Sequence, residues 1–146
     1  MNKFTKSKSA LFLMELVIVI LFFSICAAVC MQLFVQTHLL GQKTSELNNS
    51  VTAAQGVAEV VRGTDGSIDT LMKYYPAAVT DGEHYMEIYY NDAFDLCDYA
   101  DAQYACKVTM VDEMYIRNLD ISVSRISDGD NIYSLNASKY TGYIND

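Results

Sequence analysis

The pattern of apolar and polar positions divides the 146-residue chain into four parts. Residues 1–10 are polar and basic, and residues 11–35 are mostly apolar, with one charge, Glu15, and one Gln. Residues 36–62 lack proline and repeat apolar side chains at helical spacing, whereas residues 63–146 contain short alternating stretches. The pattern predicts a leader, a membrane-length helix, an amphipathic continuation of that helix and a β domain, in that order.

The apolar segment 11–35 is long enough to cross a bilayer. As a helix it would extend about 37 Å at about 1.5 Å per residue, and a hydrocarbon core is about 30 Å thick. Lys3, Lys6 and Lys8 precede it, so the positive-inside rule predicts a single-pass protein with a cytoplasmic N-terminus and an extracytoplasmic C-terminal domain. A cleavable secretory signal is the competing interpretation, although its apolar core is usually shorter, about 7–15 residues.

Residues 36–62 are expected to continue the helix beyond the membrane, with one apolar stripe along it. Two interpretations stay open. One is a single helix of about 50 residues that ends at Gly63. The other is two helices with a break near residues 41–50, where Gly41 and Asn48–Ser50 lower the helix propensity. We favour the single helix. The stripe consists of Leu40, Leu47, Val51, Ala54, Ala58 and Val61.

Four stretches after residue 63 alternate apolar and polar side chains as β-strands do. Between the last two, SDGDN at 127–131 has the Asp-Gly pair of a tight hairpin. Residues 68–75 suit a short helix that Pro76 ends. The predicted fold class is α+β, with a long N-terminal helix packed on an antiparallel sheet of three to four strands. The strand candidates are residues 84–90, 104–111, 118–126 and 132–137.

The formal net charge of −8 excludes one class of partner. Nucleic-acid binding needs a basic patch, and the sequence has none beyond its leader. No metal-binding, nucleotide-binding or nucleophile motif is present, and His38 and His84 are isolated from other candidate catalytic groups. We therefore expect no enzymatic activity and no cofactor.

The four cysteines form two pairs in the sequence. Cys97 and Cys106 flank DYADAQYA. Because the outer side of the membrane is oxidising, we predict a disulfide between them, with two free thiols as the alternative. Cys26 and Cys30 lie one helical turn apart within the apolar segment and are interpreted as small packing residues.

Aspartates and tyrosines supply weaker candidates. Aspartates recur at every third position from 92 to 101 and could offer oxygen ligands to calcium. Their spacing is not that of a known calcium loop, so a solvated acidic loop is the favoured interpretation and we assign no metal site. Several tyrosines suit either a partner-binding surface or cross-strand packing. The residues are Asp92, Asp95, Asp98 and Asp101, and Tyr85, Tyr89, Tyr99 and Tyr104.

The N-terminal segment resembles that of the type IV pilin and pseudopilin family. Its leader ends in a small residue, Ala10, and a carboxylate, Glu15, stands at the fifth position of the apolar helix that begins at Leu11. MELVIVI at 14–20 is similar to the IELLIVI stretch typical of the family. The resemblance covers residues 3–35, and the family more often has Gly at the position of Ala10.

This resemblance implies a structural role and a set of partners. A prepilin peptidase would cleave between Ala10 and Leu11, and the new amine of Leu11 would be methylated. Glu15 would pair with the N-terminal amine of a neighbouring pilin-like subunit in a filament built by an assembly ATPase and platform complex. The expected function is therefore a minor pilin or pseudopilin of a type IV pilus-like or type II secretion-like machine. The alternative is a static single-pass anchor that carries a binding or accessory domain.

Overall fold

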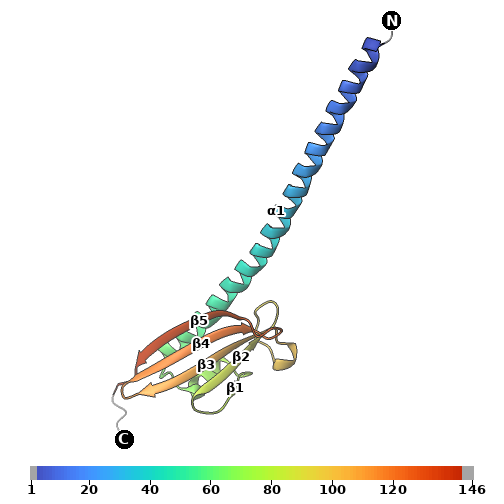
Figure 1. Ribbon diagram of the computed structural model, residues 1–146. Helices are drawn as coiled ribbons and strands as arrows, with labels where there is room; N and C mark the ends of the chain where they lie inside the picture. Colours follow the sequence, from blue (N-terminus) through green and yellow to red (C-terminus); the bar gives the residue numbers. More distant parts are fainter. Residues whose placement is uncertain (1–2, 143–146) are drawn as a thin grey trace. The chain divides into compact units, whose positions relative to one another are not determined.

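The computed structural model describes residues 3–142 (Figure 1). These divide into two compact units, separated between Lys43 and Thr44. Two helices, α1 and α2, and a short 3-10 helix, η1, are combined with five strands. The elements are α1 (Lys3–Gly63), α2 (Ile68–Tyr74), β1 (Val79–Thr80), β2 (Tyr85–Tyr90), η1 (Tyr99–Asp101), β3 (Tyr104–Glu113), β4 (Ile116–Arg125) and β5 (Asn131–Tyr140).

A single helix, α1, occupies the whole N-terminal region, which confirms the single-helix interpretation and its end at Gly63. The break considered near residues 41–50 is not formed. The helix starts at Lys3 instead of residue 11, since nothing in residues 3–10 stops a helix: the segment contains neither Gly nor Pro.

The five strands form one antiparallel sheet in the order β1-β2-β3-β4-β5 (Figure 1). The four predicted strands are confirmed, but the sheet has five strands where three to four were predicted. The missing strand, β1, has only two residues, too few for an alternation to be recognisable. The predicted SDGDN hairpin joins β4 to β5, and Gly129 takes the left-handed φ of 72° that this turn requires.

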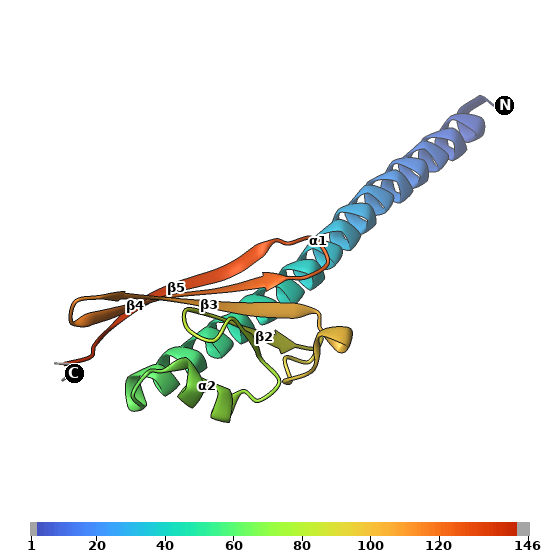
Figure 2. The ribbon, with the colours of Figure 1, turned by 90° about the horizontal axis from the view of Figure 1, so that it is seen from below.

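The C-terminal part of α1 covers one face of this sheet (Figure 2). Ala54, Val57 and Val61 of the helix are buried against it, and the alternation predicted for β2, β3 and β4 correctly identifies the buried face. The predicted stripe is right at Ala54 and Val61, but Leu40 and Leu47 are exposed. The sheet residues of this core are Met86, Ile88, Tyr90, Cys106, Val108, Met110, Leu119, Ile121 and Val123.

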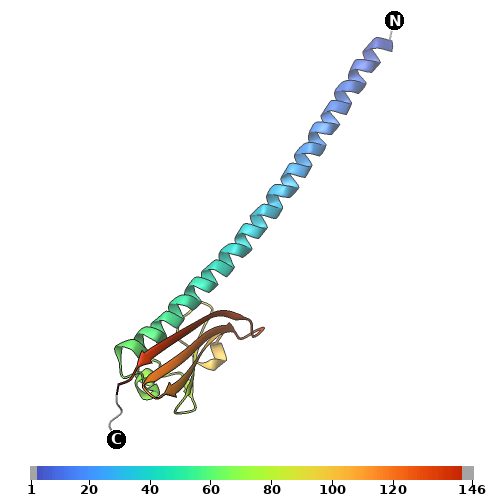
Figure 3. The ribbon, with the colours of Figure 1, turned by 60° about the vertical axis from the view of Figure 1, so that its left-hand side comes forward.

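The helix end and the last strand are joined by polar contacts, and Figure 3 shows them side by side. Lys139 of β5 donates to the carbonyl of Val61 at 2.8 Å and also to that of Thr64. Arg117 of β4 donates to the carbonyl of Gly66 at 2.7 Å. Val61 lies in the last turn of α1, so Lys139 complements the negative end of the helix dipole and gives a partner to a carbonyl that the helix leaves unpaired. The other two bonds give partners to carbonyls of the loop just after the helix.

Candidate functional site

The apolar part of α1 has no cover within its own chain. Every residue from 9 to 45 is exposed. By length and composition this helix can cross a membrane, and none of its apolar window is buried. Burying an apolar side chain is favourable by about 1.5–3 kcal/mol. A bilayer or other subunits could supply the cover that this segment lacks within its own chain.

Glu15 is the one charged residue between Lys8 and Lys43. Its helical neighbours one turn away, Leu11 and Val19, are apolar, and its side chain is exposed. Among the side chains described from residue 9 to 142, no cation pairs with it. If this segment spans a bilayer, an unpaired carboxylate within it is costly.

The hydroxyl groups of the same segment have a different arrangement. Ser24 donates to the carbonyl of Ile20 at 2.8 Å, and Thr37 donates to that of Leu33 at 2.8 Å. The helix thus provides partners for these polar side chains, whereas no described side chain from residue 9 to 142 forms an ion pair with Glu15.

Ala10 and Leu11, the predicted cleavage site, both lie inside α1 with exposed side chains. Glu15 is one helical turn past Leu11 on the same side of the helix. The three positions expected for processing, methylation and assembly therefore lie together on one short stretch. Their roles remain predictions.

In the second unit, a second carboxylate of α1 has the partner that Glu15 lacks. Arg125 at the end of β4 donates to both oxygens of Glu46, at 2.9 and 2.7 Å, and also to Asp128 at 2.6 Å. The side chains of Glu46 and Arg125 are 15% and 29% exposed. The hydrogen bond from Arg125 is the main cause that holds the pKa of Glu46 below its ordinary value. Burial opposes this effect, and a hydrogen bond from Tyr104 adds to it.

No sequence pattern identified this pair. Glu46 was outside the expected apolar stripe, yet it lies on the covered side of α1, one turn before the buried Ser50. Glu46 and Arg125 are 79 positions apart, and neither belongs to a recognisable motif. Only the packing of α1 on the sheet identifies them as partners.

The predicted disulfide is not formed in the structure: Cys97 and Cys106 are both free thiols. Cys106 is fully buried on the α1 side of the sheet, and that burial raises its pKa to about 12. Cys97 lies in the loop after β2 and is partly exposed. Cys26 and Cys30 are exposed on the apolar helix.

The acidic loop does not assemble a metal site. Within residues 3–142, no three His, Cys, Asp or Glu side chains come together in a way that could hold an ion. Asn91 organises the start of the loop, because its Oδ1 accepts from the backbone N–H groups of Ala93 and Asp95. The aspartates at 92, 95, 98 and 101 thus belong to a loop that is built by backbone contacts.

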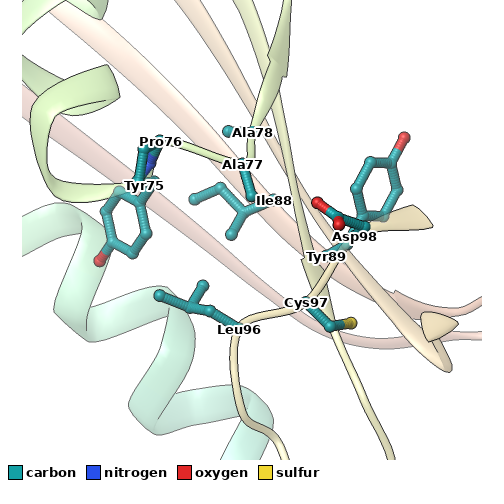
Figure 4. A pocket seen from close by; sticks show the side chains of 9 residues that line it. All are labelled: Tyr75, Pro76, Ala77, Ala78, Ile88, Tyr89, Leu96, Cys97 and Asp98. Atoms are coloured by element: carbon teal, nitrogen blue, oxygen red, sulfur yellow. The ribbon is translucent and has the colours of Figure 1, made fainter. Parts of the chain in front are cut away.

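A small apolar cavity of about 240 Å³ lies between this loop and the segment after α2 (Figure 4). Its volume is below the range of about 300–1,000 Å³ typical of ligand sites. Its lining is mainly apolar and includes four residues with polar groups, Tyr75, Tyr89, Cys97 and Asp98. The lining residues are Tyr75, Pro76, Ala77, Ala78, Ile88, Tyr89, Leu96, Cys97 and Asp98.

The tyrosines divide between the two faces of the sheet. Tyr104 stacks on Phe94 with ring centroids 4.2 Å apart, next to the core. On the opposite face, Tyr85 donates to Glu87 at 2.9 Å, and Tyr89 meets Tyr99 edge to face at 5.3 Å. Cross-strand and loop packing therefore accounts for much of this set.

Comparisons with protein-family models, with curated proteins and with solved structures give no match for this chain.

Proposed function

We propose that this chain is a pilin-like structural subunit, a minor pilin or pseudopilin, that assembles into a type IV pilus-like or type II secretion-like filament through α1. The observation that carries the proposal is Glu15, the one charge in an uncovered apolar helix, five positions into the segment that follows Ala10. The continuation of the same helix onto an antiparallel sheet supports it.

The physical mechanism is a charge pair between subunits. Removal of residues 1–10 exposes an amine on Leu11. In the low-dielectric core of the filament, this amine forms an ion pair with the carboxylate of Glu15 on an adjacent subunit. Leaving either member of a buried pair alone costs roughly 3–5 kcal/mol. Registers that leave Glu15 unpaired are therefore strongly disfavoured, and the pair selects one axial stagger of the helices.

Before assembly, the apolar segment anchors the subunit as a single-pass membrane protein. The lysines of the leader keep the N-terminus in the cytoplasm, where a prepilin peptidase acts. The second unit then lies outside the membrane, and an assembly ATPase and platform complex drive extrusion. The acidic charge of the chain gives nucleic acid no basic surface to bind.

Intact-mass spectrometry of the membrane fraction tests the processing step. The expected polypeptide lacks residues 1–10 and carries a methyl group on Leu11. Replacing Ala10 by a bulky residue, in Ala10→Leu, should retain the leader. A full-length polypeptide in the wild-type membrane would contradict the proposal and would instead support the static single-pass anchor.

Glu15→Gln tests the charge pair, with Ser24→Ala as the matched control. Both substitutions change one polar side chain of the same apolar helix, but the hydroxyl of Ser24 is already bonded within it. Loss of about 3 kcal/mol corresponds to association that is more than about 100-fold weaker. Subunit cross-linking in membranes should show that loss for Glu15→Gln alone, and equal assembly of the two variants would overturn the mechanism.

A further inference from the structure

The turn between β3 and β4 carries an apolar side chain in an unfavourable backbone conformation. Met114 has a φ of 48°, in the left-handed region that hairpin turns usually give to Gly, Asn or Asp. Its side chain is 90% exposed. Phe94, with a φ of 61°, also takes this conformation, but its ring packs on Tyr104. Met114 has no comparable contact, and strain of this kind commonly marks functional positions.

Other apolar side chains surround Met114 on the outer face of the sheet. Met110 and Leu119 are buried towards α1. Because successive side chains of a strand alternate, Val111 and Ile116 face away from the helix. Tyr140 is directly opposite Ile116 in the register of β4 and β5. We call Val111, Met114, Ile116 and Tyr140 the distal patch; their exposed fractions are 51%, 90%, 46% and 68%.

The distal patch lies at one end of the second unit. At one end of β4, Arg125 contacts Glu46, close to where α1 enters this unit. At the other end, Arg117 contacts Gly66, just after α1 has ended. The helix residues Glu46 and Val61 are separated by about 22 Å at about 1.5 Å per residue. The patch is thus at the end of the sheet opposite the entry of α1.

The border of the distal patch is negative. Glu113 is opposite Ile116 in the register, and Asp120 follows on the same outer face of β4. Neither carboxylate forms an ion pair with a described residue of the chain. The nearby cations are already occupied: Lys139 donates to the α1 carbonyl of Val61, and Arg117 donates to the carbonyl of Gly66 after α1 and to Asp112. Residues 44–142 contain sixteen Asp and Glu against six Lys and Arg.

We propose that the distal patch docks a different protein, one that presents an apolar surface bordered by Lys and Arg. Apolar area and opposite charge together favour such a partner. A second copy of this chain would bring the same carboxylates into contact. Nucleic acid and anionic lipid would be repelled for the same reason. The inference goes beyond filament assembly, since the patch belongs to the second unit and not to the apolar helix.

A photo-crosslinking experiment on the full chain in membranes of its native host tests this docking. The benzophenone-bearing analogue of phenylalanine replaces Tyr140 in one sample and Tyr99 in the other. Tyr99 is the matched control, because it is 67% exposed and Tyr140 is 68% exposed. After irradiation, mass spectrometry identifies the cross-linked peptide. The expected result is one discrete protein adduct from position 140, attached to an apolar peptide flanked by Lys or Arg, and absent from position 99.

Three variants then test which features the adduct needs. Ile116→Ser removes apolar area, and Glu113→Lys reverses a border charge; each should lower the adduct yield at least fivefold. Met114→Gly removes the side chain and relieves the positive φ. It should lower the yield while raising the thermal midpoint of the chain, a combination that a merely structural role for Met114 would not produce.

Several results would overturn the proposal. These are adducts only with lipid, with a second copy or with an acidic peptide, no protein adduct at all, the same adduct from position 99, or yields that Ile116→Ser leaves unchanged. Glu15→Gln separates this inference from the proposed function. With Glu15→Gln, loss of assembly with an intact position-140 adduct supports docking on its own, whereas loss of both shows that the adduct came from a filament neighbour and overturns it.

Discussion

At the residue scale, two glutamates of the same helix have opposite environments. Glu46 accepts hydrogen bonds from Nε and Nη2 of Arg125, whereas Glu15 has no cationic partner among the side chains described from residue 9 to 142. The first carboxylate therefore stabilises the fold of its unit, and the second is available to a neighbour. Sequence patterns identified Glu15 because a lone charge in an apolar run is conspicuous. They missed Glu46 because a charge in an amphipathic segment is not.

Glu46→Gln should make stability less dependent on pH. The pKa of Glu46 is lowered on folding, so its contribution is complete above its ordinary value of 4.5 and is lost as the pH falls through the lower folded-state value. At pH 7 the variant should lose about 1.5–3 kcal/mol, the range for a hydrogen bond to a charged group. Urea unfolding of the full chain in detergent, monitored by circular dichroism between pH 3 and 7, measures both effects.

Glu59→Gln is the matched control for this prediction, because Glu59 is exposed on the same helix. It should unfold like the wild type at every pH. A similar loss in both variants would mean that the effect comes from the overall charge of the chain and not from the pair with Arg125.

At the element scale, the sequence predicted the β region better than the helix. Strands β2, β3 and β4 each bury alternate side chains in the core. That period of two is recognisable within five or six residues. The predicted stripe on α1 wrongly included Leu40 and Leu47. Both fit the helical period, but the sheet does not cover them. Which side of a long helix is covered depends on where its partner ends, and that is a tertiary property.

Val57→Ala and Leu47→Ala distinguish the covered side from the exposed one. Val57 is fully buried, whereas Leu47 is 44% exposed. Truncating Val57 should therefore cost about 2 kcal/mol of unfolding free energy. Truncating the larger Leu47 should cost less than about 0.5 kcal/mol. Chemical unfolding of the full chain in detergent gives both values, and a larger loss from Leu47→Ala would show that the helix contacts the sheet along the originally expected stripe.

At the scale of the whole molecule, the two units depend on different surroundings. Residues 44–142 contain their own core and their own helix-capping contacts. Residues 9–43 bury no side chain within the chain, although they are helical. Isolated helices are marginal in water and gain most of their stability from packing. The apolar residues 11–35 can obtain it from a bilayer, but residues 36–43 extend beyond the predicted span and have neither bilayer nor core.

Hydrogen exchange of the full chain in lipid nanodiscs should therefore single out residues 36–43. Local opening is easiest where few side chains are buried, so their amides should exchange faster than those of residues 54–61, which lie on the core. In assembled filaments the same amides should become protected, because neighbouring helices would then pack around them. Equal protection of 36–43 and 54–61 in isolated subunits would contradict this. Rapid exchange that persists in filaments would instead show that assembly buries only the apolar half of α1.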